Sequence, residues 1–393
     1  MQPPCRSAPI NLLECGSLLS IPSLTMLRAC ALLLWFMLPS LASAAGARMT
    51  MLAGAAEPGG AFDLRIDDAW PNTCVPRLEA IEVSGPDLWV IARDTSEAAV
   101  CGQTLTPYSL DTRLLASNRE GIELVGVQRL HYVVRSTANL RLRGFDLVAM
   151  GESLELAPEP ESGYWWADPA ASNPWAGRGI GLNLERQGAT LSGVLFGYDV
   201  SGEPEWSLGA GSIGPYFSRL GLSRLSDGSG PAQPYREPRS LRPLGALLLE
   251  PASPSRARVW LVYQDSETAD LSLRQIDLVR FGFDASPARV WSTGEWLLLP
   301  PADETGRSIA RQFAFSHVEG NASGFTLMDP ERGAALVCRM GSANSERVPE
   351  RCELSVVSED KATTHSFDRI GLRRMQGAAP DGGSVRLIHL DAN

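Results

Sequence analysis

The stretch GYWWADPAASNPWAGRGIGLNLERQGATL, residues 163–191, contains the strongest indication of the fold. Its first nineteen residues hold three tryptophans, a tyrosine, two prolines and four glycines. Apolar and polar residues then alternate with the period of a strand. A turn at 187–189 separates two such strands, and the turn DVSGEPE at 199–205 precedes Trp206. Short strands joined by tight turns predict a β-meander.

The composition of the whole chain favours an all-β fold. Among 393 residues there are 37 glycines and 28 prolines, which supply many turns. Hydrophobic residues make up 44% and charged residues 20%, as in a globular protein with room for several domains. The net charge of −10 argues against partners with a phosphate backbone, so we expect no binding of nucleic acid.

The region before the quoted stretch has its own strand pattern. Residues 60–150 contain alternating runs and a hairpin signal at 84–87, and LAPEPES at 156–162 has the composition of a linker. About ninety residues with several strands and one pair of cysteines predict a β-sandwich of immunoglobulin-like type.

An internal repeat follows the linker. The first copy covers residues 163–282 and the second covers 291–377. Residues 211–243 are rich in Gly, Ser, Pro and Arg, and we expect them to form a long loop within the first copy. Each copy is predicted to be a β-meander that closes into a barrel, because closure removes exposed strand edges.

Each copy opens with Gly-x-Trp and closes with an arginine on its last predicted strand. This arrangement resembles the signature of calycins, the lipocalin-like and avidin-like up-and-down barrels. The resemblance implies that the tryptophan plugs one end of the barrel and that the arginine lies across it. It pairs Trp165 with Arg280 and Trp296 with Arg374. A guanidinium over an indole ring is favourable where water is excluded.

A longer motif, G-x-W-W-N-P-x-x-S-G-x-G followed by Q-G and Y-D-x-x-G-x-P-x-W, resembles one found in a set of exported proteobacterial β-proteins. The resemblance implies an exported bacterial protein and no particular activity. The matching residues are Gly163, Trp165, Trp166, Pro169, Ser172, Gly179, Gln187, Gly188, Tyr198, Asp199, Gly202, Pro204 and Trp206.

The N-terminus contains a targeting pattern. Residues 26–44 read MLRACALLLWFMLPSLASA, with one positive charge, an apolar run too short to span a bilayer and a small-residue cleavage site. We predict a secretory signal peptide that starts at Met26, the true start of the protein, and that residues 1–25 are a mis-assigned N-terminal extension. The mature protein is expected to be periplasmic or extracellular, without a membrane span.

Removal of residues 1–44 leaves four cysteines, Cys74, Cys101, Cys338 and Cys352. An even number in an exported protein predicts two disulfides. Pairing of neighbours, Cys74 with Cys101 and Cys338 with Cys352, is favoured among the three connectivities. No spacing of cysteine or histidine typical of a metal site occurs, so neither a metal nor another cofactor is expected.

No motif of a known catalytic site is present. There is no G-x-S-x-G, H-E-x-x-H, P-loop or G-x-G-x-x-G sequence, and the four histidines lie far apart. Carboxylates such as Asp199 and Glu185 surround the aromatic stretch, where a pair could serve a glycosidase, but turn and strand roles explain them better. We therefore predict that the protein is not an enzyme and keep a hydrolase as the weakest alternative.

The aromatic residues offer the candidates for a binding site. Trp165 and Trp206 are expected in the core, because tryptophans in small barrels bury much surface. Trp166 faces the opposite side of its strand from Trp165. The predicted ligand-binding residues are Trp166, Trp175, Arg178 and Tyr198.

Two functions from different classes fit these features. The first is an exported, non-enzymatic binding or envelope-interaction protein. The second is a periplasmic carrier that holds a small apolar ligand or a glycan in a barrel mouth. A carrier predicts an apolar cavity, whereas an interaction module predicts filled barrels and an exposed aromatic patch. The expected partner is a protein, a glycan or a small apolar ligand.

Overall fold

The computed structural model describes most of the chain after residue 46. The predicted extension 1–25 and signal peptide 26–44 lie outside the described residues, as do Trp175 and Arg178. The described ranges are 47–51, 61–98, 100–115, 124–151, 154–168, 179–199, 201–230, 232–238, 240–264, 268–281, 287–302, 306–321, 323–340, 348–358 and 361–390.

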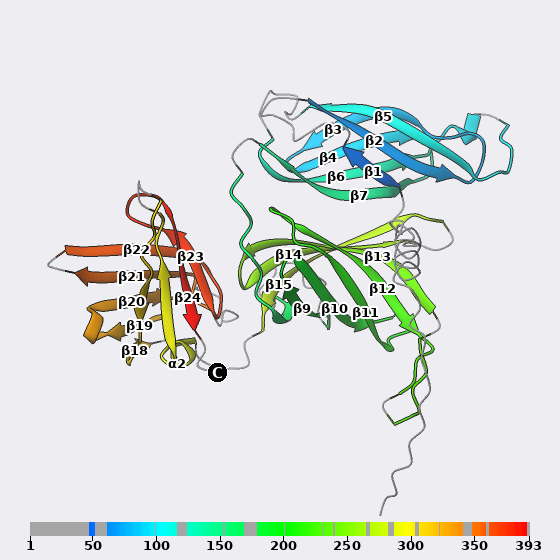
Figure 1. The fold of residues 1–393 in the computed structure, drawn as a ribbon. Helices are drawn as coiled ribbons and strands as arrows, with labels where there is room; N and C mark the ends of the chain where they lie inside the picture. Colours follow the sequence, from blue (N-terminus) through cyan, green and yellow to red (C-terminus); the bar gives the residue numbers. More distant parts are fainter. Residues whose placement is uncertain are drawn as a thin grey trace, which may run out of the picture. The chain divides into compact units, whose positions relative to one another are not determined.

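The N-terminal part consists of two sheets (Figure 1). One sheet has three strands in the order β1–β2–β5, and the other has four in the order β3–β4–β6–β7. Between β4 and β5 lies the short 3₁₀ helix η1 (Ser96–Ala98). The strands are β1 (Arg48–Met51), β2 (Ala61–Trp70), β3 (Arg77–Ser84), β4 (Asp87–Arg93), β5 (Thr106–Leu115), β6 (Gly126–Arg135) and β7 (Leu140–Met150).

Both sheets contribute to one hydrophobic core. Phe62, Leu64 and Ile66 of β2 face Val90 of β4 and Tyr132 of β6, and all five side chains are buried. The region therefore consists of two sheets packed around a shared core. Its immunoglobulin-like type is not confirmed, because β4 and β6 pair in parallel in the middle of the four-stranded sheet.

The central part is a closed barrel of eight antiparallel strands, drawn in green and yellow-green in Figure 1. Each strand pairs with the next along the chain, and the last pairs with the first. The strands are β8 (Gly163–Ala167), β9 (Gly181–Gln187), β10 (Thr190–Tyr198), β11 (Pro204–Ser212), β12 (Ser218–Ser226), β13 (Ser240–Ser253), β14 (Arg256–Gln264) and β15 (Leu271–Arg280).

The predicted loop 211–243 is wrong in part. Residues 218–226 form strand β12, which pairs with β11 and β13. Leu220 and Leu222 of this strand are buried in the barrel interior, and the alternating residues Arg219, Gly221 and Ser223 point outward. The interior is packed by one cluster of side chains: Trp165, Ala167, Leu182, Leu184, Leu191, Leu195, Leu220, Leu222, Leu247, Leu249, Ala257, Val259, Leu261, Ile276 and Leu278.

The C-terminal part is one sheet of nine strands around a single core, with the order β17–β16–β24–β23–β22–β21–β20–β19–β18. It is preceded by the short helix α2 (Pro287–Trp291) and contains the 3₁₀ helix η2 (Pro330–Arg332). The strands are β16 (Glu295–Leu299), β17 (Arg311–Phe313), β18 (His317–Asn321), β19 (Gly324–Asp329), β20 (Ala334–Arg339), β21 (Arg351–Ser358), β22 (Lys361–Ile370), β23 (Arg374–Ala378) and β24 (Ser384–Leu390).

This sheet corrects two expectations for the second repeat. It is an open, half-barrel sheet, since the strand order of the described residues ends at β17 and β18. It also extends past the predicted end at residue 377, because β24 pairs with the first long strand, β16. In the barrel β15 pairs with β8, and in this sheet β24 pairs with β16. The last strand therefore lies beside the first strand in both repeats.

The outer face of the barrel along β13, β14 and β15 is covered by the sandwich. Phe145 and Leu147 of β7 form one buried cluster with Leu248, Trp260 and Val262 of the barrel. We call this the covered face. It shows that outward-pointing apolar side chains of this barrel can be hidden by another part of the same chain.

Candidate functional site

The outer face of the barrel along β8, β10 and β11 carries large apolar side chains in contact with solvent. We call this surface the aromatic platform. Their exposed fractions range from 36% for Phe196 to 64% for Tyr198. The members are Tyr164, Trp166, Phe196, Tyr198, Trp206 and Leu208.

The strand register places most of the platform in two adjacent rows. In the first row Trp166 pairs with Gly181, Gly181 with Phe196, and Phe196 with Trp206. The second row contains Tyr164, Asn183, Val194 and Leu208. The rows run across four neighbouring strands, so the platform is built on the ladder of a closed barrel and not on a loop.

Two glycines lie beneath aromatic rings of the platform. A methyl group on Gly181 would lie 3.4 Å from the Cε3 and Cζ3 atoms of Trp166. A methyl group on Gly179, whose φ is +82°, would lie 3.2 Å from Cε2 of Tyr198. The absence of a side chain at both positions lets the rings approach the backbone closely. Tyr164 and Phe196 also stack, with centroids 5.9 Å apart and an interplanar angle of 13°.

An acidic turn borders the platform between β10 and β11. Asp199 Oδ1 accepts hydrogen bonds from the backbone N–H of Ser201 and Glu203 and from the Ser201 hydroxyl. These bonds, the one from the Ser201 hydroxyl above all, lower the pKa of Asp199. Asp199 thus has the turn role expected from the sequence, and it adds a negative charge next to Tyr198.

The predicted ligand-binding residues are partly brought together. Trp166 and Tyr198 both belong to the platform. Trp206 was expected in the core, and this is wrong, because its side chain is 48% exposed. Tyr164 and Phe196 were not predicted. Phe196 lies two residues before Tyr198 on the same strand and therefore points to the same side of the sheet. The register of the β10–β11 hairpin pairs Tyr198 with Pro204, and it therefore pairs Phe196 with Trp206.

The expected Trp165–Arg280 pair lies at the seam where the barrel closes. Trp165 is completely buried, in contrast to Trp166, and it pairs with Arg280 across β8 and β15. The Trp165 indole N–H donates to the carbonyl of Glu161 at 3.0 Å, and Arg280 Nε donates to the carbonyl of Ser162 at 2.9 Å. Burial lowers the pKa of the Arg280 guanidinium.

Gly163 is required at this seam. Its φ is +123°, and a methyl group there would lie 2.5 Å from a guanidinium nitrogen of Arg280. A side chain would therefore displace the arginine. The element on which the resemblance rests, Gly-x-Trp with a terminal arginine, has a steric reason in the first copy.

In the second copy the residue that corresponds to Arg280 is His389. Trp296 is completely buried and pairs with His389 of the last strand, with ring centroids 4.8 Å apart. His389 Nε2 donates to the carbonyl of Thr293 at 2.6 Å, just as Arg280 donates to the carbonyl before Gly163.

Arg374 has a different role from the one expected. It lies on β23, which is separated from Trp296 by β24. Its Nη1 donates to Glu159 of the linker at 2.7 Å. Burial alone would raise the pKa of Glu159, but hydrogen bonds from Arg186 and Arg374 hold it below its usual value. Arg374 therefore anchors the linker and does not cover Trp296.

Both disulfides are confirmed. Cys74 and Cys101 are joined over a sequence separation of 27 residues, and Cys338 and Cys352 over 14 residues. The second bridge links directly paired positions of β20 and β21.

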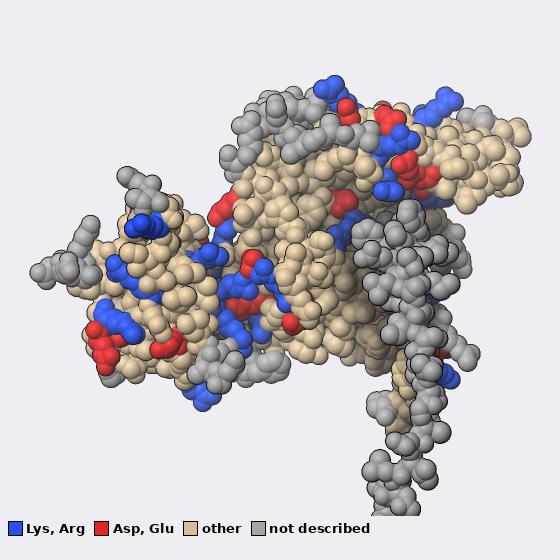
Figure 2. All heavy atoms as spheres, viewed as in Figure 1, with Lys and Arg blue, Asp and Glu red and all other residues tan. Residues whose placement is uncertain are grey.

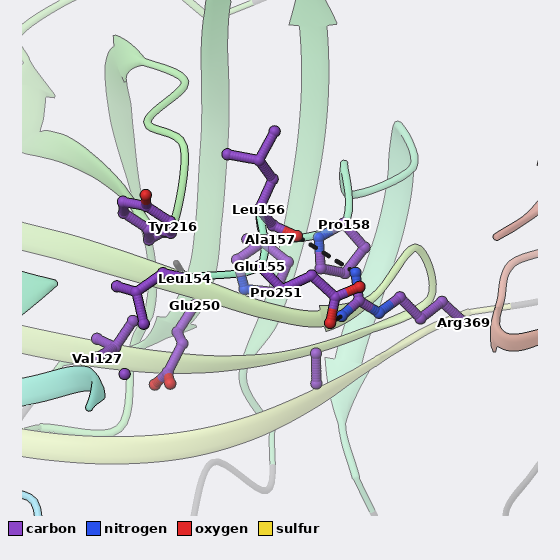
Figure 3. A pocket seen from close by; sticks show the side chains of 12 residues that line it. Val127, Leu154, Glu155, Leu156, Ala157, Pro158, Tyr216, Glu250, Pro251 and Arg369 are labelled. Atoms are coloured by element: carbon purple, nitrogen blue, oxygen red, sulfur yellow. Dashed lines mark hydrogen bonds and ion pairs between the residues drawn. The ribbon is translucent and has the colours of Figure 1, made fainter. Parts of the chain in front are cut away.

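A hollow of about 250 Å³ lies beside the linker and is shown in Figure 3. Arg369 forms an ion pair with Glu155 and donates to the carbonyl of Leu156 at 3.3 Å, so the chain itself bridges the opening. A second hollow of about 330 Å³ lies on the outer side of β14 and β15, where Arg258 pairs with Asp277 at 3.2 Å. Arg369 and Glu155 in the first hollow and Arg258 and Asp277 in the second are partnered within the chain, and we assign no ligand to either hollow.

One histidine is paired with a carboxylate. His131 Nε2 lies 2.8 Å from Asp87 Oδ1, and the ring stacks on Trp89 and meets the edge of Phe145. None of these neighbours is a nucleophile. Burial lowers the pKa of His131, while the bond to Asp87 opposes the shift. The arrangement is that of a packed core histidine.

Neither a metal-binding cluster nor a membrane-spanning helix occurs among the residues that the structure describes. No cluster of three or more His, Cys, Asp or Glu side chains there is suited to hold a metal ion. Within the same residues, no helix is long and apolar enough to cross a membrane. On the face shown in Figure 2, basic and acidic side chains are intermixed rather than gathered by sign.

Comparisons with known proteins add no further assignment. No protein family model matches the chain, and no curated protein sequence matches it.

Proposed function

We propose that this protein is an exported, non-enzymatic binding protein of the bacterial envelope and that the aromatic platform is its binding surface. The observation that carries the proposal is the row Trp166–Phe196–Trp206, which is held on rigid strands and open to solvent. Contact between water and a contiguous apolar surface is unfavourable, so such surfaces mark binding sites.

Export is supported by the chain itself. The signal-peptide pattern of residues 26–44 predicts secretion. The two disulfides fit an oxidising compartment, where such bonds persist. The resemblance to exported proteobacterial β-proteins points the same way.

The alternative function, a carrier with a ligand inside the barrel, has less support. A carrier needs an apolar cavity within the strands. Here leucines from β9, β10, β12, β13 and β14 meet Trp165 in a single packed cluster. The solvent-exposed apolar surface lies on the outside of the barrel, which favours the first function.

The test is co-sedimentation of the purified protein with the envelope fraction of a Gram-negative bacterium. The double variant Trp166→Ala/Trp206→Ala removes two rings of the platform. Tyr235→Ala is the matched control, because Tyr235 is 84% exposed and lies outside the platform. We expect the wild type and the control to sediment with the envelope and the double variant to remain in solution.

The proposed function requires a difference between the variants. Equal sedimentation of all three proteins, or none at all, would contradict a binding role for the platform. Melting curves of each variant establish that loss of binding is not loss of folding.

A further inference from the structure

We infer that the ligand of the aromatic platform is an extended, uncharged polysaccharide chain, whose sugar rings stack on Trp166, Phe196 and Trp206. This inference rests on the proposed function and specifies the chemical class of the ligand.

The exposure of the rings is the first argument. Trp166 and Tyr198 approach the backbone at Gly181 and Gly179 and still have exposed fractions of 45% and 64%. Their π surface is therefore open to a partner. The π face carries partial negative charge and attracts polarised hydrogens. The C–H groups on the face of a pyranose ring supply these hydrogens.

The spacing of the rings is the second argument. Trp166 and Phe196 flank β9, so two strand spacings of about 4.8 Å each separate their backbones. Trp206 follows one strand further on. A sugar in an extended β-linked chain advances by about one strand spacing. A chain that crosses the strands therefore presents one sugar to Trp166, the second sugar after it to Phe196 and the next one to Trp206.

The polar surroundings are the third argument. Asn183 lies in the second row between Tyr164 and Val194, where an amide can exchange hydrogen bonds with hydroxyl groups. Asp199 and Glu203 border the platform on the exposed turn. These carboxylates repel an anionic polymer, and the net charge of −10 adds to the repulsion. The favoured ligand is therefore rich in hydroxyl groups and without negative charge.

The same charges separate a glycan from a nucleic acid, which also stacks on aromatic rings. Proteins that bind single strands combine stacking with a positively charged groove along the phosphates. Here the turn next to Tyr198 is acidic.

The experiment extends the envelope sedimentation described above and uses the intact purified protein. One portion of envelope is digested with protease. Another is oxidised with periodate, which cleaves the vicinal diols of sugars and leaves the polypeptide backbone intact. Platform-dependent sedimentation is defined as the difference between wild type and Trp166→Ala/Trp206→Ala. We expect periodate to abolish this difference and protease to leave it unchanged.

A competition assay supplies the direct measurement. Glycans released from the same envelope are freed of protein and separated into neutral and acidic pools on an anion exchanger. We expect the neutral pool to displace the wild-type protein at a concentration at least tenfold lower than the acidic pool. Trp206→Phe retains a ring and is expected to bind within threefold of wild type, whereas Trp206→Ala loses at least tenfold.

The outcomes separate the two proposals. Sedimentation that is lost after protease and survives periodate would overturn the glycan inference in favour of a protein partner, and the proposed function would stand. Displacement by the acidic pool alone would also overturn it. Absence of any platform-dependent sedimentation from untreated envelope would refute the proposed function itself.

Discussion

The barrel has two apolar outer faces, and among the described residues only one of these faces is covered by another part of the chain. On the covered face Trp260 is 5% exposed beneath Phe145 and Leu147. On the aromatic platform Trp166 is 45% exposed. Both tryptophans point away from the barrel interior. The comparison teaches that described residues of the same chain cover the outward apolar side chains of one face and leave those of the platform in contact with solvent.

The largest difference between the two faces is expected when one tryptophan on each face is replaced by alanine. Trp260→Ala should lower the free energy of unfolding by about 3 to 5 kcal/mol, because it leaves a cavity between barrel and sandwich. Trp166→Ala should change it by less than about 1 kcal/mol, since its ring already contacts water. Urea unfolding followed by circular dichroism measures both. Equal losses would mean that the two faces do not differ in burial.

A second test concerns the buried ion pair between Arg143 and Asp68, which lies beside the covered face. Arg143 of β7 is buried and donates to Asp68 at 2.7 Å and 3.0 Å and to the carbonyl of Thr268 at 2.8 Å. Arg143→Ala leaves Asp68 as an uncompensated buried charge, at a cost of about 3 kcal/mol.

The matched control for Arg143 is an arginine at the protein surface. Arg135 is about half-exposed and lies 3.6 Å from Glu79. Arg135→Ala should cost less than about 1 kcal/mol, because water screens an exposed pair. The measurement is differential scanning calorimetry of the two variants. Equally lowered melting temperatures would show that Arg143 contributes no more to stability than the surface arginine Arg135.

A third test uses pH. His131 packs against Phe145 of the covered face, and burial lowers its pKa below the usual 6.5. Its charged neighbours are Asp87, which favours the protonated ring, and Arg129, which disfavours it. The folded state keeps the imidazole neutral where the unfolded chain binds a proton. Stability is therefore complete above pH 6.5 and falls below it, by at most about 1.4 kcal/mol per pH unit from this group.

The measurement for His131 is urea unfolding at pH 7.5, 6.5 and 5.5 in wild type and His131→Gln. The variant should lose less stability between pH 6.5 and 5.5 than the wild type does. His365, whose pKa burial also lowers, accounts for part of the slope that remains in both proteins. An identical slope in the two would exclude His131 as a source.

The smallest expected effect concerns the contact between Gly181 and the ring of Trp166. Gly181→Ala adds a methyl group 3.4 Å from the ring of Trp166, which is ordinary contact distance. We expect stability to change by less than about 0.5 kcal/mol. Envelope binding should stay within about twofold of wild type, because the methyl group fits beside the ring. Gly188→Ala, in the β9–β10 turn, is an unsuitable control because its φ is +59°, so Ser192→Ala of β10 serves instead. A larger loss of binding in Gly181→Ala would show that the contact between the Trp166 ring and the β9 backbone matters for binding.

Much of the fold was predictable from local sequence. The all-β class and both disulfides followed from alternation and the cysteine count, whereas the neighbourhood of Trp165 and Arg280 was implied only by the resemblance to calycins. Strand β12 was missed, because Ser218–Ser226 contains only two buried leucines among small and polar residues. Its neighbours β11 and β13 provide the pairing that composition does not indicate.

The platform was predictable only in part. Trp166 followed from its position next to Trp165, whereas Trp206 required the register of the β10–β11 hairpin. The role of His389 was missed because the second repeat was ended at residue 377, one strand too early. Whether an outward apolar residue is covered depends on the packing of another sheet, and no local pattern within the barrel encodes that.

The pairing of the first strand of each repeat with its last has a consequence for the order of events in synthesis. β8 cannot complete the barrel before β15 exists, and β16 must wait for β24 in the same way. Contacts between residues so distant in sequence form slowly. The sandwich, made entirely from residues before 151, has no such delay. During synthesis the chain would thus contain a folded sandwich, whose Phe145 and Leu147 can pack against the barrel strands as these are completed.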